Sequence, residues 1–405
     1  MVPWPAQRGP APRRTTFFLL ALLIAGSGIP AAGQRRGDSA WVGTWASAPM
    51  AGKASPALAG ETLRQIVRTS VAGAEVRMRI SNLFGVRPLR IEDVHLAIAS
   101  TGSAIVAGTD HRVRFSDRTF AVVAPGSSLV SDPIPMNLPA LTKVAVSFYL
   151  PKGPGPITWH PSAHRTNYRA PGDVSSRIEL PDAATTGSYY FLTNIDVQGE
   201  GLSGAVVTLG ASITEGYKAT DAENKRWPDI LAQRLASQGI QVGVLNEGIS
   251  GNRLLHAGAG ASAEARFERD VVEQPGVRWV IFADDPINDL GSTRPAPTLQ
   301  ALIRGTERLI AEAHRNHILF YCSTLTPFEG ADYWTPAEEV TRERFNAFIR
   351  GRNSGCDAVI DQDEMTHDPA RPIRFLPAYD SGDHLHPNDA GHRAIADGID
   401  LSLFR

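Results

Sequence analysis

The carboxyl-terminal half of the chain contains a serine, an aspartate and a histidine that could together perform nucleophilic catalysis. Ser212 follows a short apolar run and the pair Gly210-Ala211, at a predicted strand-to-helix turn from which its hydroxyl would project. Asp383 precedes His386 by three residues, a spacing at which a carboxylate can turn back and hold an imidazole in one tautomer. Taken singly, such a serine is typical of a helix cap, and such a pair is typical of a structural or metal-site fragment. Their chemistry therefore depends on whether the fold brings them together.

Two further segments could present hydrogen-bond donors to a ligand. Gly251 lies in the stretch 248–252, where the absence of a side chain lets a backbone N–H approach a ligand closely. Asn288 lies in the segment 286–289 and carries a side-chain amide. Taken alone, the first segment is typical of a tight turn and the second of an amide that shapes a loop.

Short apolar runs alternate with helical patterns from about residue 203 onward. This alternation predicts a parallel sheet covered by helices on both faces, which is a three-layer, flavodoxin-like α/β domain over residues 203–405. The predicted strands are residues 205–209, 242–245, 279–282, 318–322 and 358–360, and the clearest helices are residues 227–237, 336–350 and 389–399. Ligands of such sheets bind at the carboxyl ends of the strands, where the candidate residues fall.

Residues 40–198 show alternating apolar and polar residues with frequent turn signals, which predicts a β-sandwich-like accessory domain. Residues 63–71 and 76–80 flank a turn at Ala72-Gly73 and predict a hairpin. Further strands are predicted at residues 94–99, 128–136 and 143–150. Near the end of this half, three side chains would either line a sugar-facing edge or form a buried aromatic cluster: Trp159, His160 and His164.

The order of the chemical segments resembles the four sequence blocks of the SGNH hydrolases, also called GDSL-type esterases. These blocks centre on a serine, a glycine, an asparagine and a histidine. They match here at Gly-Ala-Ser212, Gly-Ile-Ser-Gly251-Asn, Ile-Asn288-Asp and Asp383-His-Leu-His386-Pro, and the resemblance covers about residues 203–404. Segments 226–228, 246–248 and 379–388 are similar to the branch that includes acetylxylan-esterase-like proteins, and segments 41–45 and 64–68 are similar to its amino-terminal β-domain.

The resemblance implies a role for each matched residue. Ser212 would be the nucleophile, and His386 would accept its proton and return it to the leaving alcohol. Asp383 would orient the imidazole and stabilise its charged form. The N–H groups of Ser212 and Gly251 and the amide of Asn288 would form the oxyanion hole. The first block lacks the second glycine of the Gly-x-Ser-x-Gly elbow of α/β-hydrolases.

Two positions depart from the family pattern. The family has aspartate between the glycine and the serine of its first block, where this chain has Ala211. The family also has glycine two residues before the asparagine of its third block, where this chain has Pro286, whose fixed φ excludes a glycine-specific conformation. Asp284 and Asp285 add negative charge where an oxyanion must be stabilised. These departures predict a weakened but working esterase and leave the direction of the Asn288 side chain open.

The first residues have the pattern of a cleaved export signal. Arg8, Arg13 and Arg14 precede the apolar run 17–25, and small residues follow as far as Gly33. The run is far shorter than the roughly 20 residues that span a bilayer, and no later stretch approaches that length. We therefore expect a signal peptide at residues 1–33 and a secreted or periplasmic protein that does not contact the membrane after cleavage.

Charge and cysteine content narrow the function classes. The chain of 405 residues has 40 Lys and Arg against 42 Asp and Glu, so it lacks the cation excess of a nucleic-acid-binding protein. Its two cysteines cannot form a disulfide scaffold or a four-thiolate zinc site. If Cys322 and Cys356 belong to neighbouring parallel strands, an offset of about five residues separates them by well over ~10 Å, beyond the roughly 7 Å limit for a disulfide. We therefore expect two reduced, mostly buried thiols.

Together these observations predict an exported serine esterase that removes short acyl groups, acetyl in the first place, from polysaccharide through an acyl-enzyme. The acyl preference is implied by the resemblance alone, and no cofactor is expected. One alternative is a carbohydrate-binding protein that keeps the fold and has lost hydrolysis, as Ala211 and Pro286 would suggest. Another is metal-dependent hydrolysis through Asp383, His384 and His386, although no His-Glu-x-x-His motif supports a metal. The sequence does not indicate an oligomeric state.

Overall fold

The amino-terminal part of the described chain is built almost entirely of strands. The computed structural model describes residues 40–405, so the predicted signal peptide at residues 1–33 lies outside the described residues. In the described part, the only helical segment before residue 200 is one 3-10 turn, η1 (Pro56–Leu58). No helix within residues 40–405 combines the length and the apolar character that a membrane crossing needs.

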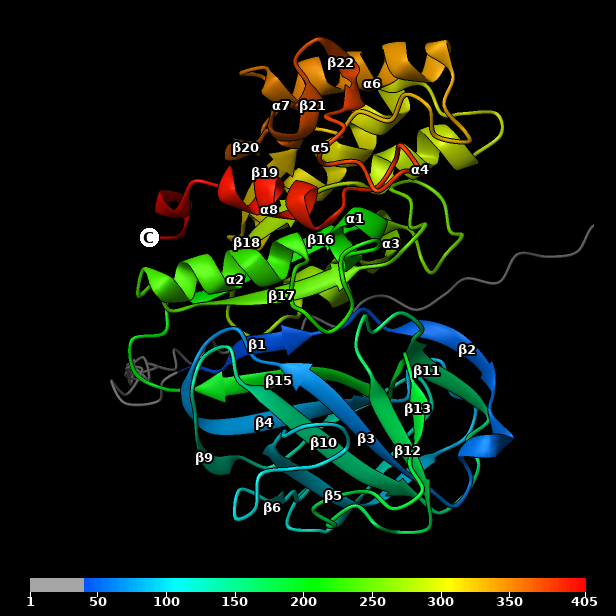
Figure 1. Ribbon diagram of the computed structural model, residues 1–405, viewed down its shortest axis with the longest axis vertical. Helices are drawn as coiled ribbons and strands as arrows, with labels where there is room; N and C mark the ends of the chain where they lie inside the picture. The colour runs from blue at the N-terminus through cyan, green and yellow to red at the C-terminus, as the bar shows by residue number, and fades with distance from the viewer. Residues whose placement is uncertain (1–39) are drawn as a thin grey trace, which may run out of the picture. The chain divides into compact units, whose positions relative to one another are not determined.

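These strands form three antiparallel sheets (Figure 1). The first contains β1 (Val42–Ala46), β15 (Leu192–Gln198), β4 (Gly73–Ser81), β8 (Ser128–Val130) and β9 (Ile134–Leu138). The second contains β13 (Ala184–Thr186), β12 (Asn167–Pro171), β3 (Glu61–Arg68), β10 (Lys143–Leu150), β5 (Leu89–Ile98), β6 (His111–Arg112) and β7 (Phe120–Val123). The third contains β14 (Tyr189–Tyr190), β11 (Pro156–His160) and β2 (Met50–Ala54). Apolar side chains of the first two sheets, among them Met78 and Phe148, share one buried core, which confirms the predicted β-domain.

The predicted hairpin between residues 63–71 and 76–80 is wrong. The two segments are strands, but β3 pairs with β10 and β12, whereas β4 pairs with β15, β8 and β9. The chain between them is held against β1, because Ser70 donates its N–H to the Thr44 carbonyl and Val71 donates its N–H to the Thr44 hydroxyl. The sequence pattern located both strands correctly, although β3 is buried on both faces. It carried no information about their partners.

The carboxyl-terminal part contains one parallel sheet. Its strands are β17 (Val242–Gly248), β16 (Gly204–Gly210), β18 (Val277–Phe282), β19 (Leu319–Ser323) and β20 (Ala358–Ile360), in that spatial order. Numbered along this part, the order is 2-1-3-4-5, which is the flavodoxin-like order. Every residue of β16 is buried, because both faces of the sheet are covered. The predicted three-layer α/β domain is therefore confirmed.

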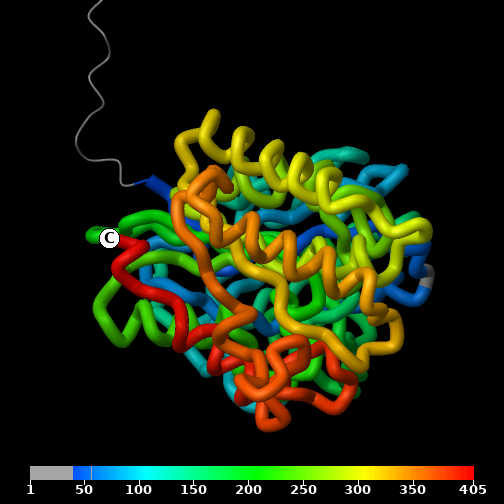
Figure 2. Tube along the Cα trace, turned by 90° about the horizontal axis from the view of Figure 1, so that it is seen from above, coloured from blue at the N-terminus to red at the C-terminus, as the bar shows by residue number. Residues whose placement is uncertain are grey.

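Helices cover the two faces of this sheet. On one face, Val206 packs in a core with residues of α2 (Trp227–Ser237) and α8 (Asp389–Asp397). On the other face, Val207 and Leu209 pack in a core with residues of α5 (Leu299–Arg315) and α6 (Pro336–Arg350), which lie side by side (Figure 2). The remaining helical segments are α1 (Ser212–Glu215), α3 (Ala263–Phe267), the π-turn η2 (Glu268–Val272), α4 (Asp285–Ser292), α7 (Gln362–Thr366) and the 3-10 turn η3 (Leu401–Phe404). A short antiparallel pair joins β21 (His367–Asp368) and β22 (Arg371–Phe375).

The β-rich part packs directly on the parallel sheet through glycines. Strand β1 lies beside β17, as Figure 1 shows. A Cβ atom at Gly243 would lie 1.9 Å from the carbonyl oxygen of Gly43, and a Cβ atom at Gly43 would lie 2.8 Å from the Leu245 side chain. A larger residue at Gly243 would require the backbone to move apart, whereas one at Gly43 would require the Leu245 side chain to shift. Gly243 therefore sets the close approach of the two parts.

The expectation of two reduced thiols is wrong. Cys322 and Cys356 form a disulfide with Cα atoms 5.8 Å apart. The register of β19 and β20 pairs Cys322 with Val359, so the offset is three residues instead of five. The chain also bends before β20, because the N–H of Asp357 donates to the carbonyl of Phe320 and draws this segment against β19. Cys356 therefore lies beside Cys322 instead of behind it along a straight strand.

Candidate active site

Ser212 is the first residue of α1 and follows directly on the carboxyl end of β16. The turn between them is tight. A Cβ atom at Gly210 would lie 2.2 Å from the Thr214 hydroxyl and 2.5 Å from a carboxylate oxygen of Asp284, so glycine is required there. Ser212 itself is 7% exposed. The structure thus holds the hydroxyl at the edge of the sheet where ligands of this fold bind.

The structure brings the three catalytic candidates into one chain of hydrogen bonds. The Nε2 atom of His386 lies 2.9 Å from Oγ of Ser212, and its Nδ1 atom lies 2.9 Å from Oδ2 of Asp383. Because the carboxylate accepts the Nδ1 proton, Nε2 is left free to accept the serine proton. The pair Ser212 and His386 is separated by 174 residues in the sequence, and only the fold joins them.

The Asp383 carboxylate is stabilised in its ionised form. Burial by itself would raise its pKa, but hydrogen bonds from the backbone N–H and the ring of His386, with the backbone N–H of Leu385, outweigh burial and lower the pKa to about 2. Lys218 adds a positive charge, with Nζ 3.8 Å from Oδ2. The carboxylate therefore stays charged over the whole range in which an imidazole can act as a base.

The ring of His386 is also confined by an aromatic neighbour. Tyr217 contacts it edge-on, with ring centroids 4.7 Å apart. The neighbouring His384 points elsewhere, because its Nδ1 atom is bound to Asp380 at 2.6 Å. Within residues 40–405, no group of three or more His, Cys, Asp or Glu side chains is arranged to hold a metal ion. The residues of the metal-dependent alternative are thus divided between two separate hydrogen-bonded pairs.

The three candidate oxyanion donors lie at the start of α1, in the loop after β17 and on α4. Gly251 has a left-handed φ of 77°, which favours glycine, and it follows β17 in the loop beside α1. The Nδ2 atom of Asn288 donates to the carbonyl of Asn252 at 3.0 Å, and its Oδ1 atom accepts from the hydroxyl of Tyr333 at 3.3 Å. One amide hydrogen of Asn288 remains for another acceptor. In the described chain, the backbone N–H groups of Ser212 and Gly251 have no acceptor of their own.

Pro286 does not turn the side chain of Asn288 away from the loop that carries Gly251. It is the second residue of α4, in the first turn, where a helix requires no N–H donor. The side chain of Asn288, two residues later, contacts the loop that carries Gly251. The proline is therefore accommodated by the helix that begins at Asp285.

Asp284 has a structural role that the sequence did not predict. Its Oδ1 atom accepts from the N–H of Ala211 at 3.0 Å and from the hydroxyl of Thr214 at 2.6 Å, and its Oδ2 atom accepts from the N–H of Ile213 at 2.8 Å. The expectation that its charge opposes an oxyanion overlooked these three donors, which hold the carboxylate against the start of α1. Asp284 thus braces the turn that carries Ser212 from a neighbouring strand end.

Asp285 lies buried beneath the site. Burial raises its pKa to about 7, against the opposing charge of Arg266, whose Nη2 atom is 3.7 Å from Oδ1. The nearby carboxylates of Asp284 and Asp289 raise it further. Neither carboxyl oxygen of Asp285 has a hydrogen-bond partner in the described chain. Near neutral pH this carboxyl is therefore partly protonated, so it adds less negative charge to the site than the sequence suggested.

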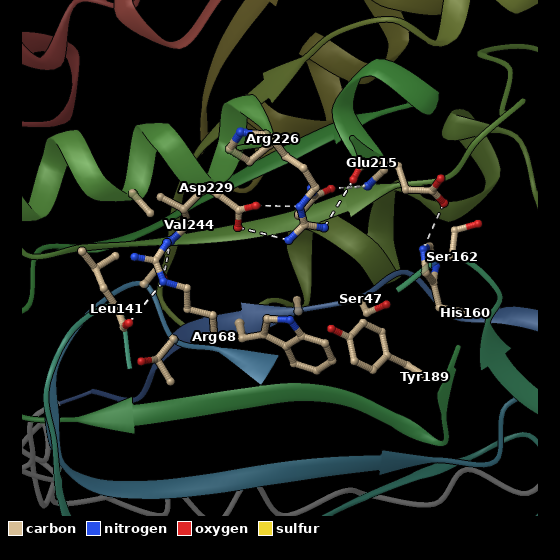
Figure 3. Close-up of a pocket in the computed structure, with 18 residues that line it drawn as sticks. Ser47, Arg68, Leu141, His160, Ser162, Tyr189, Glu215, Arg226, Asp229 and Val244 are labelled. Atoms are coloured by element: carbon tan, nitrogen blue, oxygen red, sulfur yellow. Dashed lines mark hydrogen bonds and ion pairs between the residues drawn. The ribbon is translucent and has the colours of Figure 1, made fainter. Parts of the chain in front are cut away.

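A second group of residues at the site includes Glu215 and Ser250, for which the sequence predicted no role. Glu215, the last residue of α1, contacts His160 (Figure 3). It is also bound by Ser250, and His164 lies close to it. His160 is buried, as the cluster interpretation of that segment expected, but its partner is a carboxylate of the other domain. No local pattern could have linked these residues, because they lie on three separate segments.

The comparisons with known proteins concern the carboxyl-terminal part. Residues 208–394 match the model of the GDSL-like lipase/acylhydrolase family. No curated protein sequence shows significant similarity to this chain.

Three solved structures illustrate the structural similarity. An acetyl xylan esterase, AlAXEase, is 19% identical, with 48% of this chain and 96% of that chain covered and a TM-score of 0.37. Axe2, an acetylxylan esterase from Geobacillus stearothermophilus, is 19% identical, with 48% and 91% covered and a TM-score of 0.37. A GDSL-like lipase from Bacteroides thetaiotaomicron is 18% identical, with 50% and 88% covered and a TM-score of 0.37. Sequence identities and TM-scores this low give no ground for transferring an activity to this chain.

Proposed function

Residues 208–394 match the model of the GDSL-like lipase/acylhydrolase family, and from this premise we propose that the chain is a serine esterase that hydrolyses short-chain esters, acetyl esters in the first place, on polysaccharide. The family match supports an ester hydrolase. The single observation that carries the serine mechanism is the continuous hydrogen-bonded chain from Ser212 through His386 to Asp383. The preference for acetyl groups on a carbohydrate rests on the sequence resemblance to acetylxylan-esterase-like proteins.

In the proposed mechanism, Oγ of Ser212 attacks the ester carbonyl while its proton moves to Nε2 of His386. The charged imidazole is stabilised by the ionised Asp383. The carbonyl oxygen gains negative charge and is bound by the N–H groups of Ser212 and Gly251 and the amide of Asn288. The proton on Nε2 then passes to the leaving alcohol as the C–O bond breaks, which leaves an acyl-serine. A water molecule attacks this ester by the same steps and releases the acid.

We further propose that the protein acts outside the cytoplasm. The predicted signal peptide at residues 1–33 supports export. The disulfide between Cys322 and Cys356 supports it independently, because structural disulfides persist mainly in oxidising compartments.

Two features support hydrolysis over the alternative of a binding protein that has lost its chemistry. The alternative was based on Ala211 and Pro286. Asp284 supplies a carboxylate to the turn in which Ala211 lies, and Pro286 fits the first turn of α4. Neither departure removes a member of the proposed catalytic chain.

The test uses the chain from residue 34 with a series of aryl esters of increasing acyl length and with acetylated xylan. We expect the acetyl ester to react fastest, acetate to be released from xylan, and Ser212→Ala to lower kcat at least ~10³-fold. Ser237→Ala is the matched control, because it removes an exposed hydroxyl that donates only to the Arg234 carbonyl at the end of α2. Glycan binding without hydrolysis in the wild type would support the alternative, and equal rates in wild type and Ser212→Ala would overturn the serine mechanism.

A further inference from the structure

Glu215 lies three residues after Ser212 on the same short helix and is 2% exposed. Each of its two carboxylate oxygens contacts Ser250 and one histidine. Oε1 accepts from the N–H of Ser250 at 3.2 Å and lies 3.0 Å from Nε2 of His160. Oε2 accepts from the hydroxyl of Ser250 and lies 3.5 Å from Nε2 of His164. One buried carboxylate therefore connects the helix of Ser212, the loop before Gly251 and the β-domain.

His160 of this cluster has a polar partner at each ring nitrogen. His160, at the end of β11, is 5% exposed, and its Nδ1 atom lies 2.9 Å from the carbonyl oxygen of Ala48. A carbonyl can only accept, and Glu215 is held as a carboxylate because the hydrogen bonds of His160, His164 and Ser250 outweigh burial and lower its pKa. The ring of His160 thus joins the Ala48 carbonyl of the β-domain to the carboxylate of Glu215 through its two nitrogens.

The space around this pair does not accommodate a substrate. His160 and Glu215 line a cavity of about 40 Å³ between the β-domain and helices α1 and α2, which Figure 3 shows from the side. A cavity of this size holds only a few water molecules, since one water needs ~10–15 Å³ of such space. A role in positioning therefore fits the geometry, whereas a role in binding a ligand does not.

The contact between Glu215 and Ser250 acts on one proposed oxyanion donor, the N–H of Gly251. The N–H of Gly251 belongs to the peptide group that begins at Ser250, and Ser250 is held at its N–H and its hydroxyl by Glu215. The same loop is pressed against α1, because a Cβ atom at Gly248 would lie 2.3 Å from the backbone nitrogen of Glu215. The Nδ2 atom of Asn246 donates to the carbonyl of Thr214 at 2.8 Å. The orientation of the Gly251 N–H relative to Ser212 is thus set through Glu215.

We propose that His160, supplied by the β-domain, is a positioning residue of the active site: by pairing with Glu215 it holds Ser250, and with it the Gly251 N–H, in register with Ser212. This inference rests on the proposed ester hydrolysis. A buried contact between a histidine and a carboxylate is a costly way to join two domains, because apolar side chains of similar volume hold an interface at least as well. An apolar contact does not orient an N–H group. The pair of His160 and Glu215 does so, because Glu215 binds Ser250, whose peptide group carries the Gly251 N–H.

The experiment measures kcat and KM of the full mature chain with an aryl acetate. His160→Gln removes the imidazole and with it one of the two ring-nitrogen contacts, and Ser250→Ala removes the hydroxyl from a partly exposed loop. We expect each variant to lower kcat about 10- to 100-fold with KM changed less than about threefold, because a misdirected donor weakens transition-state stabilisation. In the double variant the losses should not multiply, because both changes break the same connection.

His95→Gln is the matched control. His95 is also buried in the β-domain and paired with carboxylates, Asp110 at 2.7 Å and Asp93 at 3.3 Å, but it makes no contact with α1 or the Gly251 loop. We expect it to lower the unfolding temperature without changing kcat. The inference is overturned if His160→Gln keeps the wild-type kcat, if its loss equals that of His95→Gln, or if the two losses multiply. A wild-type chain without esterase activity would instead refute the proposed function, and the inference with it.

Discussion

The carboxylate of Asp284 accepts a hydrogen bond from the backbone N–H of Ala211 at 3.0 Å, although position 211 has no carboxylate of its own. Asp284 follows β18 and Ala211 follows β16, so the contact joins the ends of two neighbouring parallel strands. The same carboxylate binds the N–H of Ile213 and the hydroxyl of Thr214. The turn that carries Ser212 is therefore held by a residue from another part of the chain.

Asp284→Asn should weaken this turn without changing its volume. The amide replaces one accepting oxygen by a donor, so at least one buried group among the Ala211 N–H, the Ile213 N–H and the Thr214 hydroxyl loses its acceptor. We expect the free energy of unfolding to fall by ~1–3 kcal/mol and kcat to fall about tenfold or more. Denaturant unfolding and steady-state kinetics with an aryl acetate measure both, and an unchanged kcat would show that the turn does not need this carboxylate.

Ala211→Asp should lower activity, although it introduces the residue that the family has at this position. Ala211 is fully buried and bound to Asp284, so a new carboxylate would face an existing one without a cation between them. Ala211→Asn has nearly the same size without the charge and should lose less. We expect kcat of Ala211→Asp to fall below that of Ala211→Asn, and a rise in kcat above the wild type would show that Ala211 is a defect.

Asp285 should make stability depend on pH near neutrality. Burial raises its pKa from 3.8 to about 7 in the folded chain, so the folded state keeps a proton that the unfolded state loses. The resulting stability is complete below pH ~4 and is lost as pH rises through 7, by up to ~4 kcal/mol. The Asp285→Asn variant has no carboxyl to titrate at this position. The difference in unfolding free energy between the variant and the wild type should therefore change by up to ~4 kcal/mol between pH 4 and pH 8. Parallel curves would contradict the raised pKa.

The disulfide should stabilise the chain without taking part in catalysis. Cys322 and Cys356 are separated by 34 residues, and closing a loop of this length stabilises the folded state by ~3–4 kcal/mol in the chain-entropy model. We expect Cys322→Ala/Cys356→Ala to lower the free energy of unfolding by about that amount and to keep kcat, since neither residue contacts the proposed triad. Under reducing conditions the wild type should approach the variant, and a variant as stable as the oxidised wild type would contradict this role.

The elements that depend on local pattern were predicted well. The helices at residues 227–237 and 336–350 and the strand at residues 143–150 have the predicted bounds. Helical and strand periodicities and capping residues act over a few positions, so they can be recognised without knowledge of the fold. The pairing of β3 and β4 with other strands, by contrast, depends on residues more than 40 positions away in the sequence.

The sequence by itself determined the parallel α/β architecture, the β-rich first half and the choice of Ser212, Asp383 and His386 as candidates. Apolar periodicity and the order of short motifs can be recognised without knowledge of the fold. Only the tertiary structure decided that His386 reaches Ser212, that Asp284 braces the turn beside Ala211, and that the two cysteines meet. Each of these relationships depends on strand register or on the packing of distant segments, where a shift of two residues or a single bend changes which side chains touch.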